Sequence, residues 1–179
     1  MKEMFEKMGF ETSEPLLNEN ATKQEIENKI DELRIKLNGK NEKEKKINSE
    51  SIVVIYFSGH GFEEKEGQQI THHLCPHNFN QNKLSSTSIN LQILKNHFSS
   101  FNCKHMLFVL DCCFSGGIFE EQNKLNIQLS NSNQNSIIIN SNQKGIWAIT
   151  AGGKEEVKEK EIEGKIRGIF TFYFIKSLN

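Results

Sequence analysis

Two unbroken apolar runs limit the folds open to this chain more than any other feature. Residues Ser51–Phe57 (SIVVIYF) and His105–Leu110 (HMLFVL) are almost wholly apolar and do not alternate between polar and apolar positions. A strand with this pattern is buried on both faces, as in a parallel sheet covered by helices. We therefore predict two parallel strands within an α/β fold.

Helical patterns flank these strands, as a covered parallel sheet requires. A short helix over Lys2–Met8 is predicted to end at Gly9, and a longer helix begins after Thr22, which has capping-box spacing to Glu25. The remaining patterned segments predict two helices and a third strand, at Ile89–Phe101, Ile169–Leu178 and Gly145–Thr150. Helices that alternate with apolar strands indicate a mostly parallel α/β sheet.

Length and composition favour a single cytoplasmic domain over residues 1–179. The 22 Lys and Arg residues nearly balance 23 Asp and Glu, which argues against nucleic-acid binding. The longest apolar stretch, Ile52–Phe57, is far shorter than the roughly 20 residues of a membrane span, so no membrane association is expected. Four cysteines, two of them adjacent, do not suggest a secreted disulfide framework. Residues 122–144 are dominated by Asn, Ser and Gln and predict a flexible polar linker, in which Ile137–Ile139 forms either a short strand or an anchor.

Each of the two apolar runs is followed by an unusual glycine-rich peptide. The first leads into Ser58-Gly59-His60-Gly61 and the second into Asp111-Cys112-Cys113-Phe114-Ser115-Gly116-Gly117. The carboxyl ends of parallel strands share one edge of the sheet, so His60 and Cys113 are expected in one crevice. There a thiolate on Cys113 can act as nucleophile, assisted by the His60 imidazole. Backbone N–H groups of Gly61 and Cys113 are candidates for an oxyanion site.

The segments YFSGHG and LDCCFSGG closely resemble the two catalytic motifs of the caspase-like cysteine peptidases, especially the metacaspases. His60 precedes Cys113 by 53 residues, which fits the caspase spacing of about 50. Three further segments carry the resemblance, which extends from about Met8 to the C-terminus: LCPHN, WAITAGGKEE and GIFTFYFIKSL. The resemblance implies a three-layer α/β/α sandwich and an endopeptidase that acts on peptides or proteins. It assigns His60 as the catalytic histidine and Cys113 as the nucleophile, with Cys112 a packed neighbour.

The resemblance also implies that Asp111 lines the first specificity pocket and pairs with a basic substrate side chain. The chain has only two arginines, Arg34 and Arg167, and neither lies in a motif where it could hold a substrate carboxylate. Cleavage after Arg or Lys is therefore expected. No cofactor is expected. Calcium dependence should be weak or absent, because Asp31 and Asp111 are the only aspartates and Asn78 stands where metacaspases usually have an acid.

One feature departs from the family pattern, and two questions remain open: activation cleavage and the oligomeric state. The family begins with a strand that lies inside the sheet, and no segment of this chain matches it. Either the chain is truncated, or another segment or a partner fills that place, because a missing inner strand leaves a strand edge to be paired. Lys124 and Lys144 bracket the polar linker and are candidates for activation cleavage. The sequence does not determine the oligomeric state.

Two other interpretations compete with the peptidase: a zinc site and an inactive caspase-like fold. The cluster His72, His73, Cys75 and His77 lacks the second ligand pair of a zinc finger and is predicted to be a polar loop beside the site. The competing hypothesis is an inactive caspase-like fold that serves as a regulatory or protein-binding module. The intact His60, Cys113 and Asp111 argue for catalysis, and the missing strand argues for the binding module.

Overall fold

The computed structural model describes residues 1–38, 50–118, 145–152, 159–162 and 165–178. The predicted linker at 122–144 and its two flanking lysines therefore lie outside the described residues.

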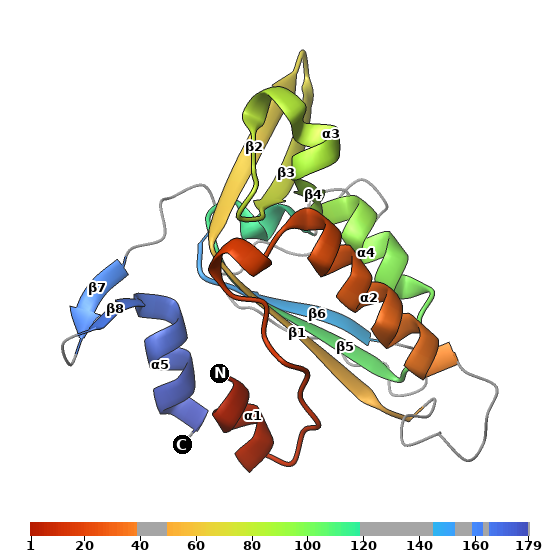
Figure 1. The fold of residues 1–179 in the computed structure, drawn as a ribbon, viewed down its shortest axis with the longest axis vertical. Helices are drawn as coiled ribbons and strands as arrows, with labels where there is room; N and C mark the ends of the chain where they lie inside the picture. Colours follow the sequence, from red (N-terminus) through yellow and green to blue (C-terminus); the bar gives the residue numbers. More distant parts are fainter. Residues whose placement is uncertain (39–49, 119–144, 153–158, 163–164, 179) are drawn as a thin grey trace, which may run out of the picture.

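A three-stranded parallel sheet forms the centre of the fold, as the apolar runs predicted (Figure 1). Its strands are β1 (Ile52–Ser58), β5 (His105–Asp111) and β6 (Gly145–Thr150), in the order β1-β5-β6. The pairing is parallel on both sides of β5. The central strand is the most deeply buried of the three: Phe108, Val109 and Leu110 are fully buried.

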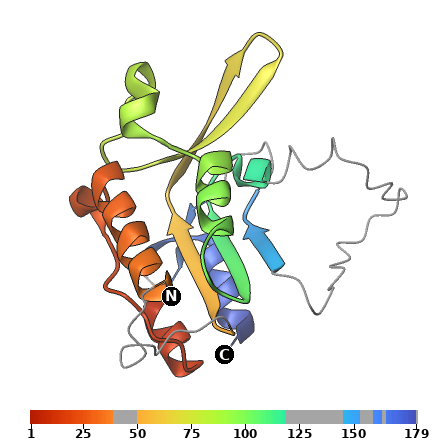
Figure 2. The same cartoon turned by 90° about the vertical axis from the view of Figure 1, so that its right-hand side faces the viewer.

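Helices cover both faces of this sheet and give the expected three layers. On one face, α2 (Lys23–Asn38) and α4 (Leu91–Ser99) pack side by side (Figures 1 and 2). The odd-numbered residues of β1 from Val53 to Phe57 belong to the core under these two helices. Tyr56 points to the other face, where it bonds to the helix α5 (Ile169–Leu178).

Aromatic packing fixes α4 against the sheet. Phe98 of α4 is fully buried and makes edge-on ring contacts with Phe101 and with Phe108 of β5, at centroid distances of 4.7 and 5.5 Å. Pairs of this geometry contribute about 0.5–1.5 kcal/mol beyond the area they bury. Phe98 therefore anchors α4 against β5.

The predicted ends of the helices are confirmed in most cases. The first helix, α1, spans Lys2–Lys7 and is followed by Gly9 in the left-handed region at φ 87°, and Thr22 accepts a hydrogen bond from the Glu25 backbone N–H. The helix predicted over Ile89–Phe101 begins two residues too early and ends two residues too late, since α4 spans Leu91–Ser99. Ile89–Asn90 forms the short strand β4, and the Asn90 side chain caps α4 by accepting from the two following N–H groups of its first turn.

A second sheet projects from the end of β1 and was not predicted. Strands β2 (His60–Glu66) and β3 (Gln69–Cys75) form an antiparallel hairpin, with β4 paired to β3. The prediction of a polar loop around His72 is therefore wrong, because this segment is a strand. Gly67, at φ 60°, makes the turn between β2 and β3. A third, two-stranded ribbon precedes α5 and consists of β7 (Glu159–Ile162) and β8 (Lys165–Gly168). Short helical turns complete the described elements, at Asn18–Asn20 (η1), Gln81–Lys83 (η2) and Leu84–Thr87 (α3).

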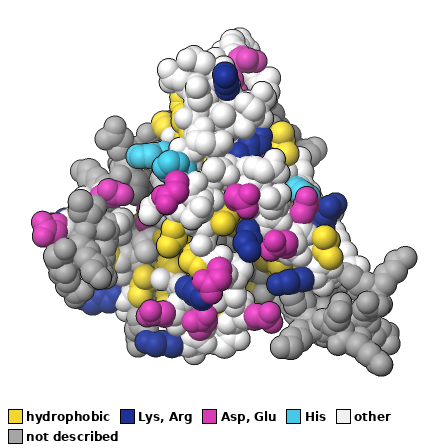
Figure 3. All heavy atoms as spheres, viewed as in Figure 1, with side chains coloured by type: hydrophobic (Ala, Val, Ile, Leu, Met, Phe, Trp, Pro, Cys, Tyr) yellow, Lys and Arg dark blue, Asp and Glu magenta, His cyan; other side chains and the backbone are white. Residues whose placement is uncertain are grey.

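The surface above α2 carries both signs of charge. Acidic and basic side chains are interspersed on the face seen in Figure 3, and ion pairs such as Arg34–Asp31 join neighbouring turns of the helix.

No helix in the described residues is long and apolar enough to cross a bilayer. In the same part of the chain no strand precedes Ile52, and β1 pairs only with β5.

Candidate active site

Strand register brings the two motifs together. The β1–β5 ladder pairs residues 53 positions apart, from Ile52 with His105 to Ser58 with Asp111. The Gly59 N–H continues this ladder by donating to the Asp111 carbonyl at 3.1 Å. His60 and Cys113 are separated by the same 53 residues. The register that pairs β1 with β5 therefore also places His60 and Cys113 at the same level, each two residues beyond the last paired residue of its strand.

Backbone contact then holds the histidine segment against the nucleophile segment. A Cβ atom added to Gly61 would lie 1.9 Å from the carbonyl oxygen of Cys113 and 3.5 Å from its nitrogen. Only a residue without a side chain fits there. His60 is exposed at the start of β2, and Cys113 is half-buried and not in a disulfide. The imidazole and the thiol thus belong to two segments in direct contact at the solvent-facing edge of the sheet.

The turn after Cys113 has an unusual backbone conformation with specific support. Phe114 has φ 57°, a region that costs a side-chain-bearing residue about 1–2 kcal/mol. Its ring stacks on that of His72, with centroids 6.3 Å apart and an angle of 22°. The Ser115 hydroxyl is fully buried and donates to the Cys112 carbonyl at 2.8 Å. These contacts fix the turn that presents the Cys113 thiol.

Asp111 is held by the start of α5. Its side chain is 3% exposed, and its Oδ2 accepts hydrogen bonds from the backbone N–H and the hydroxyl of Thr171. Tyr56 completes the chain by donating to the Thr171 hydroxyl oxygen at 2.8 Å, and burial raises the pKa of this tyrosine. Gly168 allows the approach, because a Cβ there would lie 2.3 Å from Oδ2. Oδ1 is buried and has no hydrogen-bond partner among the described residues.

Comparison with known proteins identifies the family of the chain. The peptidase family model described as the caspase domain matches residues 1–179. The chain belongs to the caspase-domain family. No curated protein matches the chain closely enough to count as a relative. Because the matched model is that of a peptidase family, peptides or proteins are the substrate class that membership implies for the caspase-domain chain.

His72 and His73 of the alternative zinc cluster have separate structural roles. Successive strand residues point to opposite faces, so His72 and His73 cannot converge on one ion. His72 stacks on Phe114, whereas the His73 ring lies 2.8 Å from the Ser88 hydroxyl and 3.2 Å from a Glu64 carboxylate oxygen. Within the described ranges no group of three or more His, Cys, Asp or Glu side chains could hold a metal ion.

The remaining cysteines differ sharply in environment. Cys112 is fully buried in the core, as predicted, and burial raises its pKa to about 12. Cys103 is buried just before β5. Cys75, at the end of β3, is directly opposite His60 in the hairpin register. Sequence reasoning missed this position because it depends on a hairpin that was not predicted.

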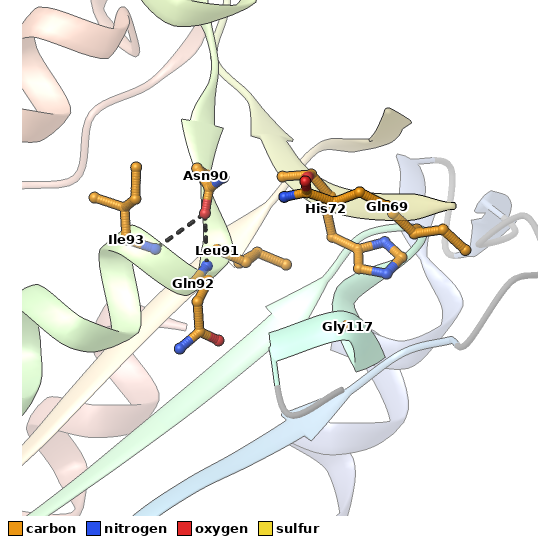
Figure 4. A pocket seen from close by; sticks show the side chains of 9 residues that line it. Gln69, His72, Asn90, Leu91, Gln92, Ile93 and Gly117 are labelled. Carbon is orange, nitrogen blue, oxygen red and sulfur yellow. Dashed lines mark hydrogen bonds between the residues drawn. The ribbon is translucent and has the colours of Figure 1, made fainter. Parts of the chain in front are cut away.

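A cavity of about 230 Å³ lies on the other side of the nucleophile turn (Figure 4). It is bounded by the Gln69–His72 half of β3, by the first turn of α4 and by Gly117. The His72 ring faces Gly117 in this view, and a Cβ at Gly117 would collide with it at 1.9 Å. Neither His60 nor Cys113 lines the cavity, because His60 is at the opposite end of the hairpin.

Proposed function

We propose that this chain is a cysteine endopeptidase in which Cys113 and His60 form the catalytic dyad. The observation that carries the proposal is the contact of Gly61 with the Cys113 backbone, which joins the two motif segments at adjacent strand ends. The thiolate of Cys113 attacks the scissile carbonyl carbon, and a thioester forms as the amine departs. His60 takes the thiol proton and gives it to that amine. The Gly61 and Cys113 N–H groups are the candidate donors to the oxyanion.

We also propose that Asp111 selects Arg or Lys at the position before the cleaved bond. One of its carboxylate oxygens is engaged by Thr171, while Oδ1 has no hydrogen-bond partner in the described residues. A buried carboxylate oxygen without a partner is destabilising, and a substrate cation would relieve this. Because Asp111 is nearly inaccessible, a basic side chain reaches its carboxylate only if the surrounding chain moves aside.

The test uses matched fluorogenic peptides that end in Arg, Lys or Asp before the reporter. We expect release from the Arg and Lys peptides only, and loss of release in Cys113→Ala and in His60→Ala. Asp111→Asn should reduce kcat/KM for the basic peptides by at least about tenfold, because a charge-assisted contact is replaced by a neutral one. Chelation of calcium should leave the rates unchanged.

Two results would contradict these proposals separately. Cleavage after Asp would refute the role of Asp111 and leave the dyad intact. The absence of cleavage in a folded sample, together with equal alkylation rates at Cys113 and Cys103, would refute the dyad and favour a binding module.

A further inference from the structure

A second thiol lies beside the proposed dyad and takes no part in its chemistry. Cys75 closes β3 and is the register partner of His60, the first residue of β2. Directly opposed residues of an antiparallel pair have Cα atoms about 4.5–5.5 Å apart and side chains on the same face. Cys75 is half-buried and is not in a disulfide. The His60 imidazole and the Cys75 thiol are therefore neighbours on one face of the hairpin.

The same strand end also meets the nucleophile. Gly61 follows His60 and is in backbone contact with Cys113. Burial, with a smaller contribution from a negative charge on Cys113, raises the pKa of Cys75 to about 11. At neutral pH Cys75 is therefore a protonated thiol and not a first target of oxidants.

We propose that Cys75 is the resolving thiol of a reversible Cys75–Cys113 disulfide, which forms when a peroxide oxidises Cys113 and which blocks the peptidase. The part of this inference that concerns blocked activity rests on the proposed function. The formation of the disulfide itself rests only on the register of Cys75 with His60 and on the contact of the adjacent Gly61 with the Cys113 backbone.

The chemistry needs one peroxide per disulfide. The Cys113 thiolate attacks a peroxide oxygen, the O–O bond breaks, and a sulfenic acid forms on Cys113. Cys75 transfers its proton to the neutral His60 imidazole and attacks the oxidised sulfur. The S–S bond forms as the S–O bond breaks, and the departing hydroxide takes the proton from His60 and leaves as water. With hydrogen peroxide, two thiols are oxidised and two waters are produced.

The other two cysteines are poorly placed for this reaction. Cys112 is adjacent to Cys113 in sequence but is fully buried in the core beneath the turn. Cys103 precedes β5, whereas Cys113 follows it, so the length of the strand separates them. Among the four cysteines of the chain, Cys75 alone lies opposite the catalytic histidine.

Peptide mapping tests the disulfide without any measurement of activity. The folded, reduced protein is treated with stoichiometric hydrogen peroxide, its remaining thiols are blocked, and it is digested with trypsin. Cleavage after Lys and Arg places Cys75 in the peptide Glu66–Lys83 and Cys113 in His105–Lys124. We expect these two peptides joined by a bond that dithiothreitol cleaves, both in the wild type and in Cys112→Ala.

Activity assays then test the block. Peroxide should inactivate the wild type, and dithiothreitol should restore it. Cys75→Ser should be active when reduced, but peroxide should drive its Cys113 to the irreversible sulfinic acid, so that at least about tenfold less activity is recovered. Cys103→Ser is the matched control and should behave as the wild type does.

The outcomes separate this inference from the proposed function. A bond between Cys112 and Cys113 within one peptide, or direct passage of Cys113 to sulfinic acid in the wild type, would overturn the resolving role of Cys75. Equal recovery in the wild type and Cys75→Ser would overturn it as well. A mapped Cys75–Cys113 bond in a protein that cleaves no peptide would retain the thiol pair and refute the peptidase proposal.

Discussion

Replacing Gly61 with alanine tests whether the contact between the two motif segments sets the geometry of the dyad. The new Cβ would lie 1.9 Å from the Cys113 carbonyl oxygen. A relaxed carbon–oxygen contact is about 3.3 Å, so the two backbones must separate by roughly 1.4 Å. A misplacement of about 1 Å can cost a hundredfold in rate, or about 2.7 kcal/mol in activation free energy. We therefore expect kcat/KM of Gly61→Ala to fall by at least about a hundredfold.

The assay is hydrolysis of the Arg-ending peptide, with the rate of Cys113 alkylation by iodoacetamide as a second measurement that needs no substrate. Gly59→Ala is the matched control, because its new Cβ would meet only the movable ring of Phe57, at 3.0 Å. We expect the control to change kcat/KM by less than about threefold. Wild-type kcat/KM and alkylation in a folded Gly61→Ala protein would refute the reasoning. Equal losses of kcat/KM in Gly61→Ala and Gly59→Ala would show only that neither position tolerates a side chain.

Three further predictions concern stability and pH. Thr171→Val removes the hydroxyl that donates to the buried Asp111 carboxylate, and chemical denaturation should show about 1.5–3 kcal/mol lower free energy of unfolding. Phe98→Ala empties a fully buried ring position under the sheet, and the same assay should show a loss of about 3–5 kcal/mol. Burial lowers the pKa of His73 below 6.5, against a smaller opposing effect of Glu64, so the unfolded chain binds more protons at mildly acid pH. Stability should thus be fully present above pH 6.5 and fall as the pH drops below it, with a shallower fall in His73→Gln.

Simple controls decide these three cases. Thr71→Val is the same substitution at a β3 position without a side-chain hydrogen bond in the described structure, and it should leave the free energy of unfolding nearly unchanged. A Thr171→Val protein as stable as the wild type would contradict the anchoring of Asp111. An unchanged Phe98→Ala protein would contradict the aromatic core. A pH slope in His73→Gln identical to that of the wild type would assign the acid sensitivity to other groups.

The parallel sheet could be predicted from sequence because its strands are buried on both faces. An unbroken apolar run such as Ser51–Phe57 is typical of a strand covered on both faces, and the motif residues follow these runs directly. The placement of His60 and Cys113 at neighbouring strand ends was therefore a local inference, and the structure has them there.

The hairpin escaped prediction because its strands are polar and project from the fold. Residues His60–Glu66 and Gln69–Cys75 contain few apolar side chains, and the pattern of a buried strand is absent. The turn residue Gly67 was a usable signal, as was Asn90, a preferred helix-capping residue directly before α4. The apolar pattern alone, without these two signals, predicts a loop at β3 and too early a start for α4.

The partners of Asp111 could not be predicted from local sequence at all. Thr171 lies 60 residues further along the chain, and Tyr56 reaches the same network from a different strand. Such contacts depend on how α5 is placed against the sheet, which no residue pattern near Asp111 encodes. The same is true of Cys75, whose position opposite His60 follows from the register of a hairpin.

The equality between the ladder offset and the spacing of the two motifs bears on how such proteins can vary. Only the distances from the strand ends to His60 and to Cys113 enter the geometry, and the length of the chain between the strands does not. Loop closure depends weakly on length, with each doubling costing about 0.6 kcal/mol. Residues could thus be inserted at the tip of the hairpin, where Gly67 has open space around it, without moving the dyad. Homologues with very different motif spacings can therefore share one active-site geometry, whereas a single deletion inside β1 would disrupt it.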